Sequence, residues 1–424
     1  MKKWLIVMSF VLMFSTMPPV QAAETFSVNA DGAILIDAET GQILHQQNAD
    51  AALGLASVSK LMTVFIVLDH IRSGELKWDD TYKVSKRVHE LSTDMSLGNV
   101  ALVEGREYTI RELYESILIF SANASTVGLT EKIAGSEEAF MPYIKKKAKE
   151  LDLQQINFVN ATGLNNVDLQ GQHLPGTGPS DENVMSTKDV AKIAYHMIKT
   201  YPEVLDITKQ PRKVFGAGTE NMVEMTSWNY MLPGYLYEYE GVDGLKTGNT
   251  TFAGQCFVGT VQRDGTRYIG VVLNARDKDN NSTYDGRFGT MKELFDYAFT
   301  TFNKTTKADK DTVTQVKVDG KEAKVKLATA LPFYEDKHAN TKIKVVATAN
   351  QHKGKIKEGD IVGTAHLAYA DGKEITYLAQ PPQVDLVATD NVHAANKTKA
   401  AAEGAGNFFS RVWKTISNFV SNIF

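Results

Sequence analysis

A run of apolar residues between positions 61 and 71 is the strongest constraint on what this chain can fold into. Leu61, Met62, residues 64–68 and Ile71 cover nearly the whole circumference of a predicted helix, which ends at Ser73-Gly74. A helix that is apolar on every side has to be buried, so other elements must surround it. The chain has 424 residues, which is more than one ordinary domain needs. We therefore expect two domains, the first built around this helix.

Other patterns between residues 24 and 303 supply the surrounding elements. Thr109-Ile110-Arg111-Glu112 matches a capping box that opens a helix leading to Ser121, and Ser186 opens another helix. Residues 256–261 and 268–273, separated by Asp264-Gly265, predict adjacent antiparallel strands. Helices packed on an antiparallel sheet indicate an α+β fold for this first domain.

Residues 309–389 consist almost entirely of short alternating segments. Asp319-Gly320 and Asp371-Gly372 each lie between such segments, and Asp-Gly at that place is typical of a β-hairpin. The region has no cluster of candidate catalytic groups. We expect a small all-β domain, similar to a β-sandwich, that serves as a spacer or docking module.

The N-terminus has the pattern of a secretory signal peptide over residues 1–23. Lys2 and Lys3 precede an apolar stretch from Trp4 to Phe14, and small residues follow at Ala22 and Ala23. This stretch is shorter than the ~20 apolar residues of a membrane-spanning helix. The alternative is a retained N-terminal anchor. We expect an exported protein at the outer face of the cytoplasmic membrane or in the cell wall.

The C-terminus predicts a flexible linker at 390–406 and an amphipathic helix at 407–424. Large apolar residues recur there at helical spacing, with polar residues between them. Such a stripe fits a helix that lies in a membrane interface, so we expect the membrane surface to be a partner. The alternative is a helix docked on the protein's own surface. The apolar residues are Phe408, Phe409, Val412, Trp413, Ile416, Phe419, Val420, Ile423 and Phe424.

Charge and composition exclude several classes of function. The net charge of −4 gives no basic face for nucleic acid. Cys256 is the only cysteine, so no internal disulfide forms, and its strand-like surroundings indicate a buried apolar residue rather than a nucleophile. His89-Glu90 lacks the second histidine of a zinc helix, and no glycine-rich phosphate loop is present. We expect neither metal nor cofactor.

The residues with catalytic potential begin at Ser57-Val58-Ser59-Lys60, at the start of the buried helix. Three positions apart, Ser57 and Lys60 share one helix face and can hydrogen-bond. A serine hydroxyl becomes a nucleophile when a neighbouring base takes its proton, and a lysine can serve if burial or another cation keeps it neutral. The helix start also offers backbone N–H groups to a developing oxyanion.

Two further motifs carry compatible groups. Ser121-Ala122-Asn123 follows the next helix, in what we expect to be a loop, and brings a hydroxyl and an amide. Lys246-Thr247-Gly248, on a predicted strand, offers a cation, a hydroxyl and a glycine that lets a substrate approach the backbone. Each motif alone is weak. The three in this order, each on a suitable element, indicate a serine acyl-transfer site.

In these motifs the sequence resembles the penicillin-binding proteins, and among them the low-molecular-mass serine-type D-alanyl-D-alanine carboxypeptidases. The resemblance continues through Val242-Asp243-Gly244-Leu245 and through residues 254–259. With the β-rich domain and the terminal helix it covers nearly the whole chain. The middle motif has Ala122 where glycine is common, and Asn249 stands where some relatives have histidine. Neither departure affects a group that the chemistry needs.

The resemblance implies a penicillin-binding, β-lactamase-like transpeptidase fold and a role for each site residue. Ser57 would attack the carbonyl between two D-alanines of a peptidoglycan stem peptide, and Lys60 would take its proton. Ser121 and Lys246 would protonate the departing D-alanine, and Asn123 would hold the substrate amide. The other implied contacts are the oxyanion hole, from the N–H groups of Ser57 and Asn249, and the carboxylate site of Thr247, Gly248 and Arg287, with Arg276 as a nearby competitor.

Other functions remain as alternatives to a carboxypeptidase. A serine β-lactamase would carry a Glu-x-x-Leu-Asn segment between Asn123 and Lys246 to activate water, and the sequence has none. Without that group, an acyl-enzyme with a β-lactam should persist. A DD-endopeptidase that cuts cross-links uses the same chemistry, and the sequence does not separate it. A non-catalytic wall-binding scaffold would have no need for the intact serine and lysine set.

Overall fold

The computed structural model describes residues 26–391, except positions 95, 170, 221, 311, 319, 340 and 352–354. The expected signal peptide at 1–23, the expected helix at 407–424 and nearly all of the linker at 390–406 lie outside the described residues. None of the helices within the described part has the length and apolar character needed to cross a membrane.

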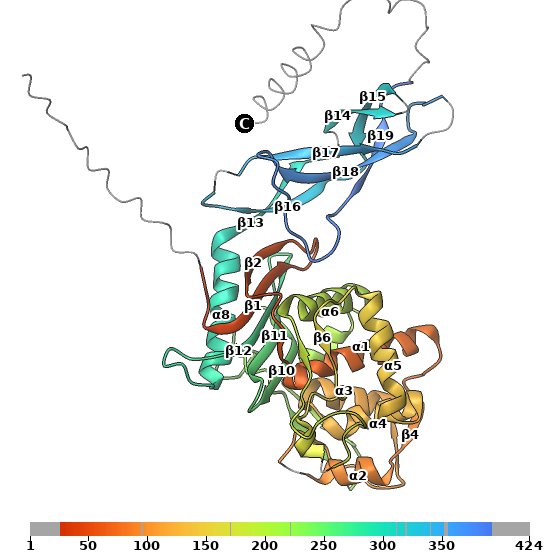
Figure 1. Cartoon of the computed structure of the whole chain (residues 1–424), viewed down its shortest axis with the longest axis vertical. Helices are drawn as coiled ribbons and strands as arrows, with labels where there is room; N and C mark the ends of the chain where they lie inside the picture. The colour runs from red at the N-terminus through yellow and green to blue at the C-terminus, as the bar shows by residue number, and fades with distance from the viewer. Residues whose placement is uncertain are drawn as a thin grey trace, which may run out of the picture.

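The N-terminal domain is built on a five-stranded antiparallel sheet with the order β10-β11-β12-β1-β2. Helix α8 (Tyr284–Thr301) packs on one face, and the remaining helices gather on the other (Figure 1). Strand β10 is at the sheet edge beside the helices, so its outer backbone groups have no strand partner. The strands are β1 (Ala30–Asp37), β2 (Ile43–Gln47), β10 (Val242–Thr250), β11 (Gly254–Arg263) and β12 (Thr266–Ala275).

Helix α1 (Lys60–Ser73) lies at the centre of the helical part, as its sequence predicts. Its residues from Lys60 to Leu68 are all buried. Four helices surround it, namely α3 (Ile110–Phe120), α4 (Asn123–Ala134), α5 (Glu137–Glu150) and α6 (Thr187–Thr200). The shorter elements of this domain are α2 (Lys86–Thr93), α7 (Val204–Thr208), β3 (Leu53–Gly54), β4 (Thr81–Lys83), β5 (Glu107–Thr109), β6 (Ile156–Asn157), β7 (Val184–Met185), β8 (Arg212–Phe215) and β9 (Val223–Thr226).

Local signals in this domain are confirmed. Thr109 and Glu112 form the reciprocal capping box of α3, and the Ser186 side chain accepts the Asp189 N–H at the start of α6. The predicted strands are β11 and β12, and the residues between them, Asp264 and Gly265, have φ of 48° and 76°. With helices packed on an antiparallel sheet, the expected α+β fold is also confirmed.

An all-β domain follows α8. Strand β13 (Phe302–Ala308) pairs with β16 (Leu331–Asp336), and a second sheet has the order β14-β15-β19-β18-β17. The predicted first hairpin is present, since β14 and β15 pair from Val318 to Lys321 across the turn; Asp319 itself is outside the described residues. The strands of the second sheet are β14 (Val313–Val318), β15 (Lys321–Leu327), β17 (Ile343–Ala349), β18 (Ile361–Tyr369) and β19 (Val384–Ala388).

The predicted second hairpin, at Asp371-Gly372, is wrong. The chain does turn after β18, but residues 373–383 form no strand against it. Instead the backbone of this segment bonds to the N-terminal domain, where Ile43 N–H donates to Thr376 O at 2.8 Å and Leu378 N–H to Gly41 O at 2.9 Å. Leu378 joins the core of that domain. The apolar residues of this segment are thus divided between the domains, since Ile375 and Tyr377 pack in the all-β core.

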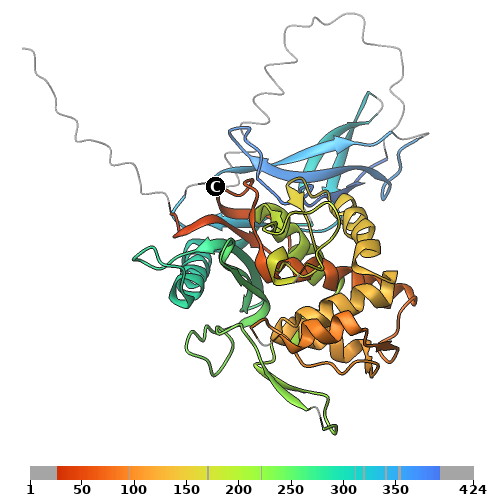
Figure 2. The same cartoon turned by 60° about the horizontal axis from the view of Figure 1, so that its bottom comes forward.

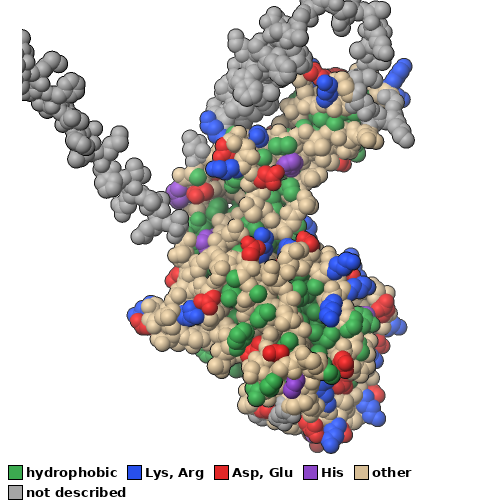
Figure 3. Space-filling model, viewed as in Figure 1, with side chains coloured by type: hydrophobic (Ala, Val, Ile, Leu, Met, Phe, Trp, Pro, Cys, Tyr) green, Lys and Arg blue, Asp and Glu red, His purple; other side chains and the backbone are tan. Residues whose placement is uncertain are grey.

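Gln42 is the polar centre of the joint between the two domains. Its side chain is 3% exposed and bonds to the Tyr334 backbone twice, donating to the carbonyl at 2.8 Å and accepting from the N–H at 3.0 Å. The Tyr334 ring packs on Tyr268 of the sheet. In the space-filling view the two domains meet at a narrow neck (Figure 3), and the turned cartoon shows β1 and β2 reaching toward the all-β domain (Figure 2).

We predict that Gln42→Ala lowers the free energy of unfolding by about 1–3 kcal/mol, because the buried N–H and C=O of Tyr334 lose their partners. The measurement is chemical denaturation of the purified protein. Gln46→Ala is the matched control, since Gln46 is an exposed glutamine nearby on β2. Equal stability of the two variants would contradict a structural role for Gln42.

Candidate active site

Ser57 lies in a tight turn at the entrance to α1. Residues Ala56–Ser59 form a 3-10 turn that continues directly into α1, so Ser57 lies at the start of the buried helix, as predicted. Ala56 has φ 47°, a left-handed conformation that is costly for alanine and that occurs at functional sites. Ser57 is half-buried, whereas its neighbours Val58 and Ser59 are buried.

Lys60 makes three short contacts in the interior of the site. Its Nζ lies 2.8 Å from Ser57 Oγ, 2.7 Å from Asn123 Oδ1 and 2.8 Å from Thr162 O. The amide and carbonyl oxygens can only accept, so they take both hydrogens of a neutral amine. Its lone pair then faces the Ser57 hydroxyl. Burial, and next the charge of Lys246, hold the pKa of Lys60 well below its ordinary value.

Thr162 is a site residue that the sequence analysis missed, because its contribution is a backbone carbonyl. The buried Asn160 Oδ1 accepts from Thr162 N, Thr162 Oγ1 and Gly163 N, which fixes the turn. Gly163 has φ 80°, and an added Cβ would lie 1.9 Å from Ala56 O. The Asn-x-Thr-Gly pattern is a turn signal that could have pointed to this segment.

Ser121 and Asn123 lie in a helix junction and not in the expected loop. Ser121 ends α3 with φ 63°, and Asn123 is already the first residue of α4. This correction follows from Gly98, whose carbonyl accepts both the Asn123 backbone N–H and its Nδ2, at 2.9 and 3.0 Å. These bonds aim Oδ1 at Lys60 and leave one amide hydrogen for another acceptor.

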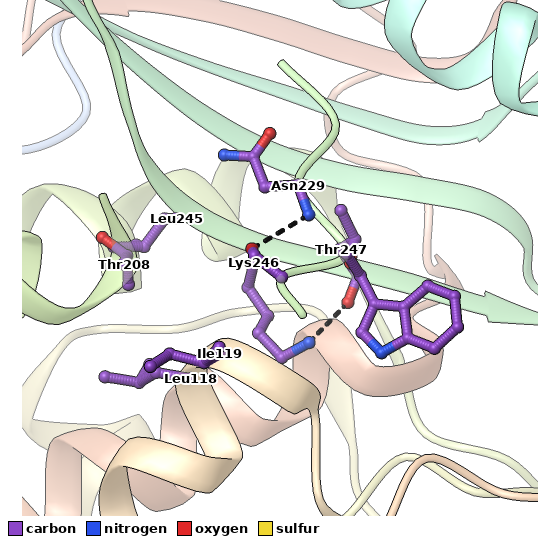
Figure 4. A pocket seen from close by; sticks show the side chains of 9 residues that line it. Leu118, Ile119, Thr208, Asn229, Leu245, Lys246 and Thr247 are labelled. Carbon is purple, nitrogen blue, oxygen red and sulfur yellow. Dashed lines mark hydrogen bonds between the residues drawn. The ribbon is translucent and has the colours of Figure 1, made fainter. Parts of the chain in front are cut away.

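Lys246 reaches from β10 to the helical wall. Its Nζ donates to Ser121 Oγ at 2.9 Å and to Thr247 O at 2.8 Å. Burial, followed by the charge of Arg287, lowers the pKa of Lys246 to about 7. Figure 4 shows a small hollow beside this lysine, where the loop before β10 faces the end of α3. A second serine–lysine pair, Ser121 and Lys246, thus lies close to the first, since the Lys246 charge acts on Lys60.

Gly248 sets the distance between β10 and the Ser57 turn. A Cβ at this position would lie 2.8 Å from Leu55 O and 3.0 Å from both Ser57 N and Val58 N. Any side chain would therefore push the strand away from the nucleophile. Asn249 comes next, at the exposed end of the strand. Gly248 therefore lies directly against the Ser57 turn, and Asn249 is the residue that follows it.

Arg287, and not its competitor Arg276, reaches this strand. One guanidinium nitrogen of Arg287 donates to Gly248 O at 2.8 Å, while Nε is buried with no partner. Arg276 is paired with Asp31 at 2.8 Å. Burial lowers the pKa of Arg287 to about 10, so it stays charged near neutral pH. A buried cation without a carboxylate partner suits a site for an anionic ligand.

Together these residues can perform acyl transfer. A serine hydroxyl faces a neutral amine, backbone N–H groups border the space above it, and a second serine–lysine pair can deliver a proton. Cys256, by contrast, lies on β11 and is buried in the core, and burial raises the pKa of its thiol to about 11. Its prediction as a buried apolar residue is confirmed. In the described part of the chain no three His, Cys, Asp or Glu side chains gather as metal ligands would.

Comparisons with known proteins agree with this chemistry. A family model described as D-alanyl-D-alanine carboxypeptidase matches residues 19–277, and one described as penicillin-binding protein 5, C-terminal domain, matches 302–394. The chain is 29% identical over 306 residues to the D-alanyl-D-alanine carboxypeptidase DacF of Bacillus subtilis. The aligned region covers 72% of this chain and 71% of that protein.

Two solved structures are similar in fold and sequence. A peptidoglycan synthesis regulatory factor (PBP3) from Streptococcus pneumoniae shares 34% identity with a TM-score of 0.75, covering 87% of this chain and 100% of that one. Penicillin-binding protein D2 from Listeria monocytogenes, in its ampicillin-bound form, shares 31% identity with a TM-score of 0.52, covering 65% and 99%. The first similarity extends beyond the catalytic domain into the all-β domain.

We predict that Arg287→Gln raises the pKa of Lys246, because the arginine charge is one of the two causes that lower it to about 7. Burial remains, so the pKa should stay below the ordinary 10.5. The measurement is an NMR titration of ¹³C-labelled lysine side chains. Arg276→Gln is the control and should leave Lys246 unchanged. A Lys246 pKa that does not respond to Arg287→Gln would contradict this electrostatic coupling.

Proposed function

Because the chain belongs to the D-alanyl-D-alanine carboxypeptidase family, we propose that it removes the terminal D-alanine from peptidoglycan stem pentapeptides through an acyl-enzyme on Ser57. The observation that carries this proposal is the contact between Lys60 Nζ and Ser57 Oγ at 2.8 Å, with two carbonyl oxygens occupying the other amine hydrogens. The chain is a serine-type hydrolase, and Ser57 is its nucleophile.

Acylation begins when Lys60 takes the Ser57 proton. The neutral amine is held toward the hydroxyl by Asn123 and Thr162, so little reorganisation precedes the attack. Ser57 Oγ then adds to the carbonyl between the two D-alanines. The N–H groups of Ser57 and Asn249 stabilise the oxyanion, and one such donor typically contributes about 3–4 kcal/mol to the transition state.

The departing D-alanine needs a proton on its amine. Ser121 Oγ accepts a hydrogen bond from Lys246 Nζ, so the hydroxyl can pass its own proton on and be resupplied by the lysine. Lys246 has a pKa of about 7, which lets it give up a proton near neutral pH. The remaining hydrogen of Asn123 Nδ2 is free to hold the substrate amide.

The terminal carboxylate of the substrate binds between Thr247 and Arg287. Arg287 is 3% exposed and its Nε has no hydrogen-bond partner among the residues that the structure describes, so a carboxylate would satisfy a buried donor. Gly248 leaves the adjacent backbone accessible. This site recognises a free C-terminus, which favours a carboxypeptidase over an enzyme that cuts within a chain.

β-Lactams are expected to acylate the same serine, because they present a reactive amide beside a carboxylate. The Listeria relative was solved with ampicillin.

We also propose a role for each part of the chain. Residues 1–23 direct export, 24–303 carry catalysis and 309–389 hold it away from the membrane. Residues 390–406 link these to a helix at 407–424 that binds the membrane surface outside the cytoplasm.

We predict that penicillin adds its mass to the purified protein and that Ser57→Ala abolishes both this adduct and D-alanine release from a stem pentapeptide. Ser59→Ala is the matched control, because Ser59 is a buried serine two residues away whose hydroxyl has no hydrogen-bond partner. Intact-protein mass spectrometry and a D-alanine assay measure the two. Rapid penicillin turnover would favour a β-lactamase. Cleavage of cross-linked dimers would favour an endopeptidase, and no reaction at all would favour a non-catalytic scaffold.

We further predict that Gly248→Ala slows acylation by roughly 100-fold, since the new methyl displaces β10 from the Ser57 turn and misplaced reacting groups lose about this much rate. The rate of penicillin adduct formation measures the effect. Gly289→Ala is the control, because an added Cβ at that helical position meets nothing within 4 Å. Acylation by Gly248→Ala at the normal rate would contradict the close approach.

A further inference from the structure

Two adjacent residues, Glu182 and Asn183, connect the two backbone segments that carry the proposed oxyanion donors. They lie just before β7 and contact the end of β10 on one side and the Ser57 turn on the other. Neither belongs to the three sequence motifs, and the mechanism above leaves both without a role.

Glu182 contacts the β10 side. Its carboxylate is 6% exposed, accepting from the Thr250 hydroxyl at 2.7 Å and from Asn165 Nδ2 at 3.1 Å. Thr250 follows Asn249 directly. The Thr250 hydroxyl also accepts the Ala253 N–H at 2.9 Å, so it is part of the turn that joins β10 to β11. Glu182 is therefore bonded to the residue next to the proposed Asn249 donor.

Asn183 contacts the other side. Its backbone carbonyl accepts the Leu55 N–H at 3.1 Å, two residues before Ser57. Its side chain accepts from Val159 N and Asn160 N at 2.7 and 3.2 Å and donates to Asn160 O at 2.9 Å. Asn160 shapes the turn that presents Thr162 O to Lys60. Glu182 and Asn183 together thus contact the end of β10, the residue before the Ser57 turn, and Asn160, which holds the turn that presents Thr162 O to Lys60.

Burial makes this connection energetically important. Desolvation raises the pKa of Glu182, while the bonds from Thr250 and Asn165 act in the opposite direction. Loss of the Thr250 hydroxyl would leave a buried carboxylate without one of its two partners, which costs more than an exposed hydrogen bond. The strand end and residues 165–182 are then free to separate.

We propose that Glu182 is a positioning residue for the oxyanion hole, fixing the Asn249 N–H relative to the Ser57 N–H through Thr250. Both carboxylate oxygens of Glu182 already accept a hydrogen bond, Oε1 from Asn165 and Oε2 from Thr250, so its role is structural. The inference rests on the proposed acyl-enzyme function. Both acylation and hydrolysis of the acyl-enzyme pass through an oxyanion, so a misplaced donor slows both steps and leaves the initial binding of the ligand unchanged.

The test compares Thr250→Val, Thr250→Ser and Glu182→Leu in the purified protein with a penicillin; leucine fills much of the same space as glutamate but cannot accept a hydrogen bond. Valine matches threonine in shape but lacks the hydroxyl, and serine keeps it. We expect Thr250→Val to slow acylation and acyl-enzyme hydrolysis each by about tenfold, with an unchanged dissociation constant for the initial complex. Thr250→Ser should retain most of both rates.

The double variant Thr250→Val/Glu182→Leu separates a shared bond from two independent effects. If the two residues act through their mutual bond, the double variant is about as slow as either single variant. The proposal would be overturned if the rate reductions of the two single variants multiplied in the double variant. It would also be overturned if only initial binding changed, or if the melting temperature fell while both rates stayed normal. An unmodified protein that forms no adduct would instead refute the proposed function, which keeps the two failures distinct.

Discussion

The site depends on the close approach of strand β10 to the turn that carries Ser57. This approach is possible because Gly248 has no side chain, since a Cβ there would lie within 3.0 Å of Ser57 N. The strand belongs to the sheet and the turn to the helical part, so one contact joins the two halves of the N-terminal domain. Lys246 crosses at the same place to bond Ser121.

A second constraint is the gathering of three buried cationic groups in one cleft. Lys60 and Lys246 are fully or nearly fully buried, and Arg287 is 3% exposed. The two lysines respond by a lowered pKa, whereas the guanidinium remains charged near neutral pH. This difference divides the chemistry, because a neutral lysine can act as a base while the arginine binds an anion. In the proposed function, the lysines would activate the serine and deliver a proton, and the arginine would recognise a carboxylate.

The two domains are joined by backbone pairing and not by apolar contact alone. Gln42 bonds to both backbone groups of Tyr334, and the segment after β18 pairs with Gly41 and Ile43. Directional bonds of this kind fix an orientation, which a purely apolar surface does less well. In the proposed function, the all-β domain would hold the cleft at a set distance and angle from the membrane.

The sequence alone determined the elements whose cause is local. The apolar run of α1, the capping box at Thr109 and the turn at Asp264-Gly265 depend on neighbours a few residues away, so each was predicted correctly. The motif residues Ser57, Lys60, Ser121 and Lys246 were proposed from their chemistry and order in the chain, and the fold brings them together in two serine–lysine pairs. Tertiary structure decided the rest. Thr162 contacts Lys60 through its backbone carbonyl, and the Asn123 N–H at the start of α4 donates to Gly98 O. Residues 373–383 bond to the backbone of the N-terminal domain. These contacts join segments far apart in sequence, and no local pattern records which distant backbone group will be the partner.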